Sequence, residues 1–147
     1  MNKINDNRLV IKPVENQKEL QQVFHIRKEV FVKEQNVAYE LEMDGFDDEA
    51  IHFIVYLKNH PVGCARIRTN KYFKLERIAI ISKYRGLGIG SKLTKYLISY
   101  CINSINKKIL MHSQKHVSEF YKKFGFVIIG EPFFEAGIEH VKMILEK

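Results

Sequence analysis

Three closely spaced glycines constrain this chain more than any other feature of its sequence. They occupy alternate positions in Arg85-Gly86-Leu87-Gly88-Ile89-Gly90. A strand-like apolar run precedes them, and Leu93, Leu97, Cys101 and Ile105 follow at helical spacing. Glycines between a strand and a helix expose backbone N–H groups to an anion, and the helix N-terminus adds partial positive charge. The segment therefore predicts a loop that binds a diphosphate.

Two other phosphate-binding loops do not fit this spacing. A Walker A loop ends in Gly-Lys followed by Ser or Thr, whereas Gly90 is followed by Ser91 and then Lys92. A dinucleotide fingerprint needs G-x-G-x-x-G and an acidic residue about 20 positions later. Here the spacing is G-x-G-x-G, and no carboxylate lies near Leu110. A glycine turn without function is the remaining alternative, and each glycine in it would cost conformational entropy.

The rest of the chain alternates between strand and helix patterns. Strands are predicted at residues 8–12, 51–57, 62–68, 74–81, 109–112, 126–129 and 140–145, and helices at residues 20–31, after Gly90 and at residues 117–124. Asn16 and Glu19 form a predicted capping box, and residues 58–61 a hairpin turn. This order predicts a mixed α/β sheet with helices packed on it, in a single domain of residues 1–147 with a flexible tail at residues 1–7.

Composition narrows the class of protein further. The net charge of +7, from 24 basic and 17 acidic residues, is compatible with an anionic partner such as a nucleic acid or a polyphosphate cofactor. No export signal or membrane-spanning run is recognisable, so we expect a cytoplasmic protein.

Cys64 and Cys101 lack metal-like spacing and are expected to be buried, reduced thiols. Residues 36–50 are acidic but do not match a calcium loop, and we expect a solvated loop or a substrate rim.

Several segments together resemble the GNAT family of N-acetyltransferases. The coenzyme A loop of that family reads [QR]-x-x-G-x-[GA], as residues 85–90 do. Residues 75–80 look like the fourth strand of the family, and residues 119–126 (EFYKKFGF) look like its F-Y-x-x-x-G-F segment. Residues 26–35, Asp44-x-x-Asp47 and residues 140–143 are similar to the bacterial subgroup that contains ElaA and YjcF. The resemblance covers residues 8–145.

The resemblance implies a fold and a cofactor. The fold would be a central, mostly antiparallel sheet of about six to seven strands flanked by about four helices. The cofactor would be acetyl-CoA, with its diphosphate on the loop amides and its pantetheine arm paired to the preceding strand. The implied cofactor-binding residues are Ile78, Ala79, Ile80, Arg85, Gly86, Leu87, Gly88, Ile89, Gly90 and Ser91.

Acetyl transfer to a primary amine requires a neutral amine, stabilisation of the carbonyl oxygen and a proton for the departing thiolate. Tyr121 matches the tyrosine with which the family protonates the thiolate, although its helical position also suits the core. Strand alternation places Glu76 on the face of Ile78 and Ile80, which makes it a candidate base. The alternative is that Glu76 pairs with an arginine such as Arg66 or Arg77.

The remaining candidates concern the acceptor. His52, His112 and His140 are alternative bases ranked below Glu76, because a lone histidine is more often structural. Arg27, Phe31, His52 and His140 are expected to contact the substrate. The acidic segment favours a cationic acceptor, namely a polyamine, an amino sugar or a lysine side chain. The expected partner is thus a small-molecule or peptide amine, without nucleic acid, membrane or metal, and a homodimer is left open.

Three other functions compete with this interpretation. Acyl-homoserine lactone synthases share an Arg-x-x-Val-Phe segment, here Arg27 to Phe31, but usually lack a full coenzyme A loop. A GNAT fold can also bind the cofactor as a non-catalytic sensor. The third alternative is a basic protein that binds nucleic acid, although no recognition helix, zinc finger or aromatic RNA platform is present.

Overall fold

The computed structural model describes residues 8–103 and 107–145. Its strands are β1 (Leu9–Pro13), β2 (Ile51–Leu57), β3 (His60–Thr69), β4 (Phe73–Ile80), β5 (Ile109–Gln114), β6 (Phe126–Glu135) and β7 (Ile138–Leu145). Its helices are α1 (Gln17–Arg27), the π-helix η2 (Lys28–Glu34), α2 (Tyr39–Glu42), α3 (Ile89–Ile102) and α4 (Ser118–Lys122), with short 3-10 helices η3 (Asp47–Glu49), η4 (Ser82–Tyr84) and η5 (Lys115–Val117). Ile105, part of the predicted helical pattern, lies outside the described residues.

The strands form one seven-stranded sheet in the order β1-β2-β3-β4-β5-β7-β6. The β4–β5 pair is parallel and the other neighbouring pairs are antiparallel. The predicted mixed, mostly antiparallel sheet is therefore confirmed. The predicted hairpin between β2 and β3 is also present, with Lys58 and Asn59 at positive φ values of 50° and 68°, as a tight hairpin turn requires.

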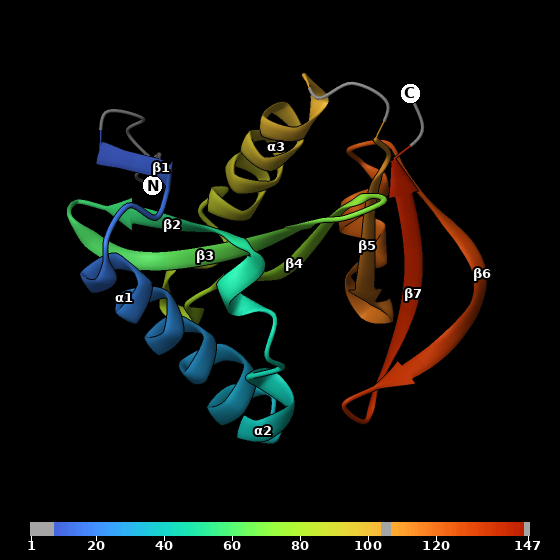
Figure 1. Cartoon of the computed structure of the whole chain (residues 1–147), viewed down its shortest axis with the longest axis horizontal. Coiled ribbons are helices and arrows are strands. Elements are labelled where there is room, and N and C mark those ends of the chain that lie inside the picture. The colour runs from blue at the N-terminus through green and yellow to red at the C-terminus, as the bar shows by residue number, and fades with distance from the viewer. Residues whose placement is uncertain (1–7, 104–106, 146–147) are drawn as a thin grey trace.

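Helices cover both faces of the β1–β4 half of the sheet (Figure 1). Val23 and Ile26 of α1 pack with Ile54 of β2 and Cys64 of β3 on one face. Residues of α3 pack with the alternate side chains of the same strands on the other face. This second core includes Phe53, Ala65, Ile67, Leu75, Ile89, Leu93, Leu97 and Cys101. Both cysteines are buried and free, as predicted.

A bulge in β4 lies just beyond the residues that pair with β5. In the pairing with β3, Arg66 is opposite Glu76 and Cys64 is opposite Ala79, so β4 carries one extra residue. Arg77, within the bulge, has a φ of 54°. Bulges bend a strand and increase its twist. Accordingly β4 pairs with β5 only over residues 73–75, and Figure 1 shows the two strands meeting there and then diverging.

The first predicted helix begins as an α-helix and continues as a π-helix. Its start is as expected, because the Asn16 side chain accepts a hydrogen bond from the Glu19 amide at 2.9 Å. The Glu19 carboxylate accepts from the amide of Glu15 rather than that of Asn16, so the capping box is shifted by one residue. The α-helix ends at Arg27, and the predicted helical stripe to residue 31 continues as the π-helix η2.

The acidic segment, expected to be a solvated loop or a substrate rim, is only partly exposed to solvent. It contains α2 and η3, and three of its carboxylates pair with arginines of the sheet and of α1. The distances between guanidinium nitrogen and carboxylate oxygen are 2.7 Å for Arg27 and Glu42, 2.8 Å for Arg66 and Asp44, and 2.7 Å for Arg27 and Asp47. Local composition could not reveal these pairs because their partners are distant in the chain. The segment is thereby fixed across the β3–β4 surface.

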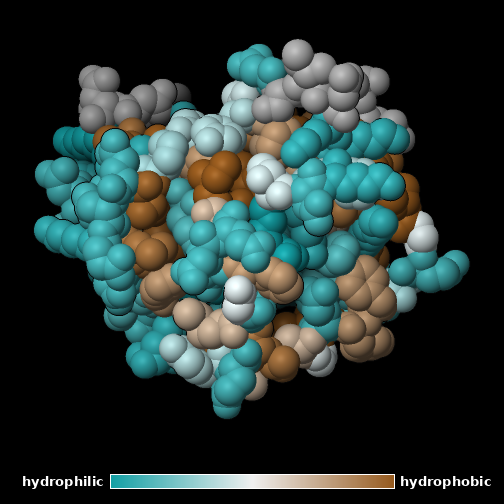
Figure 2. Space-filling view, viewed as in Figure 1, coloured by the Kyte–Doolittle hydropathy of each residue, from teal (hydrophilic) through white to brown (hydrophobic). Residues whose placement is uncertain are grey.

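The surface in the view of Figure 2 is mostly hydrophilic, and its apolar residues are exposed in small groups. Among the helices of the described residues, none has the length and apolarity that crossing a membrane would need.

Candidate active site

A cavity of about 1190 Å³ lies where β4 and β5 diverge. Its walls come from η2, the acidic segment, the bulged half of β4, the glycine loop with the start of α3, the end of β5, α4 and the β6–β7 turn. The divergence of the two strands therefore opens one space that reaches both the predicted cofactor loop and the C-terminal hairpin. Most of the predicted site residues line this space.

The glycine loop has the geometry that the sequence predicts. Gly86 and Gly88 have φ values of 79° and 85°, and a Cβ added at either would meet nothing within 4 Å. Glycine is thus required there by backbone conformation rather than by crowding. Gly88 caps α3, and a backbone bond runs from the Lys92 amide to its carbonyl at 3.2 Å. The amides of residues 88–91 precede that bond and have no partner within the helix.

Arg85 anchors this loop instead of leaving its side chain free. Its Nε donates to the carbonyl of Ile80 at 2.8 Å, and its two terminal nitrogens bind the Glu34 carboxylate at 2.6 and 2.8 Å. The next residue of the same segment, Gln35, accepts a 2.7 Å hydrogen bond from Gln114 at the end of β5. The end of η2 thus connects the two diverging strands.

The bulged part of β4 offers an open strand edge. Ile78, Ala79 and Ile80 line the cavity and lie beyond the last residue that pairs with β5. An extended ligand can add to such an edge through backbone hydrogen bonds. This edge leads directly to the glycine loop through η4.

Tyr121 belongs both to the core and to the cavity wall. It is 9% exposed and packs in the main core, with Phe120 and Phe126 as ring neighbours at 5.0 and 6.3 Å. Burial raises the pKa of its hydroxyl to about 12. The hydroxyl therefore keeps its proton at neutral pH and serves as a hydrogen-bond donor.

Glu76 lines the cavity but is held by three cations. Its carboxylate lies 2.8 Å from Arg66, 2.7 Å from Arg68 and 3.2 Å from Lys74. Although burial opposes ionisation, these cations lower the pKa of Glu76 to about 2. Such a carboxylate is a poor base, and the arginine pairing considered as the alternative is the arrangement found.

The β4 bulge also changes which face Glu76 occupies. Because Arg66 and Cys64 alternate normally on β3, their partners Glu76 and Ala79 share one face of the sheet. Ile78 and Ile80 instead pack against the core on the other face. The expectation that Glu76 shares a face with Ile78 and Ile80 is therefore wrong, because regular alternation does not survive a bulge.

The acceptor candidates fall into two groups. Phe31, His112 and His140 line the cavity. Arg27 and His52 do not: Arg27 is 1% exposed and bound to Glu42 and Asp47, and the Nε2 of His52 lies 2.9 Å from the Asp47 carbonyl. The structure thus gives both residues a structural position behind the acidic segment. Leu87, at the tip of the glycine loop, is outside the cavity wall.

Glu135, which the sequence patterns did not single out, also lines the cavity. It ends β6, beyond the strand predicted at residues 126–129, because Gly130 and Pro132 interrupt the pattern at a register shift. The Ala136-Gly137 turn, with φ values of 52° and 76°, is the signal that could have predicted a hairpin placing Glu135 opposite Ile138.

Comparison with known proteins gives consistent matches over nearly the whole chain. The family model described as "Acetyltransferase (GNAT) domain" matches residues 11–147. YjcF of Bacillus subtilis strain 168, named an uncharacterized N-acetyltransferase, is 37% identical over 131 residues, covering 88% of this chain and 94% of YjcF. The crystal structure of Escherichia coli ElaA matches with a TM-score of 0.85 at 26% identity, covering 93% and 99% of the two chains. Arabidopsis thaliana Naa50, in complex with the bisubstrate analogue CoA-Ac-MVNAL, matches with a TM-score of 0.74 at 24% identity, covering 92% and 97%.

Proposed function

Because this chain belongs to the GNAT acetyltransferase family, we propose that it transfers an acetyl group from acetyl-CoA to a primary amine by direct attack of the amine on the thioester. One observation carries the proposal. The glycine loop at the α3 N-terminus, the open edge of β4 and the Tyr121 side chain all line the same cavity. The Naa50 structure, which contains a coenzyme A bisubstrate analogue on a similar fold, supports the choice of cofactor.

The described residues fit acetyl-CoA in two places. The free amides of residues 88–91 and the partial positive charge of α3 suit the diphosphate. The backbone of Ile78, Ala79 and Ile80 suits an extended pantetheine arm. The Arg85 side chain holds the loop to Ile80 and Glu34, so we assign it to shaping the loop rather than to contacting phosphate. When bound, acetyl-CoA would supply the activated acyl group.

Tyr121 acts at the departing sulfur in this proposal. A hydroxyl whose pKa is about 12 transfers its proton to a thiolate with difficulty, because thiols titrate near about 8.5. We therefore assign Tyr121 to a hydrogen bond that stabilises negative charge on sulfur as the carbon–sulfur bond breaks. This role requires a protonated hydroxyl in the cavity, which burial provides.

Thiol release from acetyl-CoA in the presence of a panel of primary amines tests the proposal. The panel includes a polyamine, an aminoglycoside, and peptides with a free N-terminus or a lysine. We expect amine-dependent thiol release and a product heavier by one acetyl group. Binding of acetyl-CoA without amine-dependent release would favour the sensor alternative, and absence of acetyl-CoA binding would contradict the proposal. Location in the cytoplasm also stays a prediction.

A further inference from the structure

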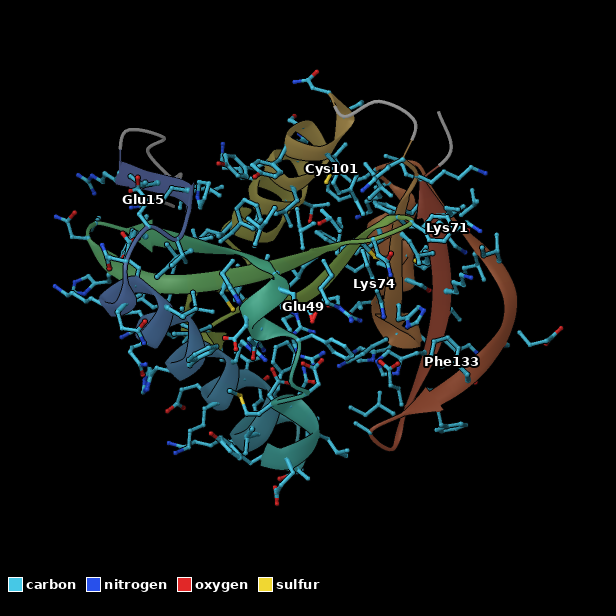
Figure 3. The ribbon with its side chains drawn as sticks, viewed as in Figure 1. Glu15, Glu49, Lys71, Lys74, Cys101 and Phe133 are labelled. Carbon is cyan, nitrogen blue, oxygen red and sulfur yellow. The ribbon has the colours of Figure 1, made fainter. Side chains whose placement is uncertain are left out.

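A cluster of two histidines and one carboxylate lies in the cavity away from the glycine loop. It consists of His112 on β5, Glu135 at the end of β6 and His140 on β7, and all three line the cavity. Strand register places them on one face, because His140 pairs with Gln114, two residues after His112, and with Phe133, two residues before Glu135. Figure 3 labels Phe133 beside β7 and Lys74 between β4 and β5.

The hydrogen bonding of His140 fixes which of its nitrogens can accept a proton. The Nδ1 atom lies 2.7 Å from the Ile138 carbonyl oxygen, which can only accept, so Nδ1 carries hydrogen. In the neutral ring the lone pair is therefore on Nε2, and this atom lies 3.9 Å from the Glu135 carboxylate. Phe133 stacks on the His140 ring at 5.9 Å and contacts the His112 ring edge-to-face at 5.0 Å. The imidazole is thus held with its basic nitrogen towards Glu135.

Glu135 differs from the other carboxylates of the cavity wall in its partners. Within the described part of the chain those residues each have an arginine nitrogen 2.6–2.8 Å away; they are Glu34, Glu42, Asp44 and Glu76. The partners of Glu135 are histidines, with His112 Nδ1 at 3.5 Å and His140 Nε2 at 3.9 Å. The neighbouring His112 holds the pKa of Glu135 below its usual range, so the carboxylate is ionised at neutral pH. Glu135 can therefore bind a cation without first losing an ion pair with an arginine.

We propose that Glu135 and His140 form the acceptor site, in which Glu135 binds the ammonium group of a primary alkylamine and Nε2 of His140 removes its proton. The inference rests on the proposed function. An ammonium nitrogen that lies beside this pair, whose Nε2 and carboxylate oxygen are 3.9 Å apart, can be within hydrogen-bond distance of both atoms. An ammonium ion suits the two groups, because an ionised carboxylate accepts hydrogen bonds from it and a basic imidazole nitrogen can take one of its protons.

The proton transfers balance in this scheme. His140 takes one proton from the ammonium, and the neutral nitrogen forms the bond to the acetyl carbon while the carbon–sulfur bond breaks. The second proton leaves the nitrogen as the amide forms and ends on the thiolate, and His140 returns its proton to water. The ionisable groups near this pair are His112 of β5 and Lys74 of β4, which act on Glu135, and Glu139, which precedes His140 and lies 3.6 Å from Lys115.

Nitrogen NMR of protein labelled at histidine tests the site without a known acceptor. Butylammonium is the probe, and uncharged butan-1-ol is the control for its alkyl chain. We expect butylammonium, but not butan-1-ol, to shift the His140 and His112 signals saturably in the wild-type protein. The shift should disappear in Glu135→Gln and persist in His25→Gln, which changes an exposed histidine of α1. Unchanged signals in the wild type, or equal shifts in Glu135→Gln, would overturn the proposal.

Kinetics with an amine identified by thiol release tests the role of His140. His140→Gln should lower kcat/KM by about 100-fold or more, as expected for loss of a general base, with unchanged affinity for acetyl-CoA. Undiminished kcat/KM in that variant would overturn the assignment of the base. Failure of the wild type to bind acetyl-CoA would instead contradict the proposed function, so the two failures are distinguishable.

Discussion

Glu34 and Arg85, 51 positions apart in the sequence, form a two-pronged ion pair with nitrogen–oxygen distances of 2.6 and 2.8 Å. The pair joins the end of the π-helix to the first residue of the glycine loop. Arg85 also donates to the Ile80 carbonyl, so one side chain connects η2, β4 and the loop. Arg85 therefore holds the loop in shape through contacts within the protein.

Arg85→Gln should weaken acetyl-CoA binding by about tenfold, because charge-assisted hydrogen bonds that hold the loop are lost. The effect on the free energy of unfolding should stay within about 1 kcal/mol, since the pair is solvent-exposed. Calorimetric titration measures the affinity. Lys83→Gln removes the same charge from an exposed neighbour as a control. Equal weakening in the two variants would mean that net charge matters and that loop shape does not.

Glu76→Gln should act on stability more than on the chemical step. Removing the carboxylate leaves Arg66, whose side chain is fully buried, short of a partner, and we expect a loss of about 3 kcal/mol in the free energy of unfolding. The exposed Glu49→Gln should change little. Urea denaturation of both variants measures the difference. A fully stable Glu76→Gln protein that had lost its kcat would restore Glu76 as a candidate base.

The same carboxylate predicts a pH dependence of stability. The pKa of Glu76 is about 2 in the folded state, against an ordinary value of 4.5. A group with a lowered folded-state pKa stabilises fully above its unfolded value and loses that contribution as pH falls towards the folded one. The wild type should therefore lose more stability than Glu76→Gln between pH 4.5 and pH 2. Parallel losses in the two proteins would contradict the ion-pair network.

The bulge in β4 can be tested through Arg77, whose φ is 54°. Arg77→Gly and Arg77→Ala both remove the contacts with Glu42 and Asp44, but only glycine adopts positive φ without strain. Arg77→Gly should therefore be more stable than Arg77→Ala by about 1 kcal/mol. The comparison uses thermal and denaturant unfolding. Greater stability of the alanine variant would argue for a regular strand at this position.

Tyr121→Phe should lower kcat by about 100-fold, the order expected when one donor to developing negative charge is removed. Affinity for acetyl-CoA should be unchanged, because phenylalanine fills the same space in the core. Since the pKa of Tyr121 is about 12, the wild-type rate should show no alkaline loss from this group below pH 10. A variant with full kcat would assign Tyr121 to the core alone.

Local sequence patterns predicted much of the fold, and most of the residues that they assigned to the site line the cavity. The strand at residues 51–57, the hairpin turn after it and the glycine loop follow from alternation and turn chemistry, which are short-range. The bulge has no such signal, because an arginine rather than a glycine adopts the positive φ. The sequence pattern therefore predicted the wrong face of the sheet for Glu76.

Long-range pairing explains the other differences. Arg27 and His52 were expected at the substrate, yet their partners Glu42 and Asp47 come from the acidic segment, which had been expected to be a solvated loop or a substrate rim. Charge spacing along the chain does not say which distant residue satisfies a buried arginine. Glu135 was missed because Gly130 interrupts β6, so that only the tertiary structure brings it to His140.

Calorimetric binding of acetyl-CoA to Gly88→Glu, with Gly130→Glu as control, tests whether the glycine loop binds the cofactor. Both glycines have positive φ and open space around them, so backbone strain is matched, but only Gly88 is in the loop. We predict binding by the wild type and by Gly130→Glu, and a loss of about 100-fold or more in Gly88→Glu, whose carboxylate repels the diphosphate at the helix N-terminus. Equal binding by both variants, or none by the wild type, would mean that the loop does not bind the diphosphate of acetyl-CoA.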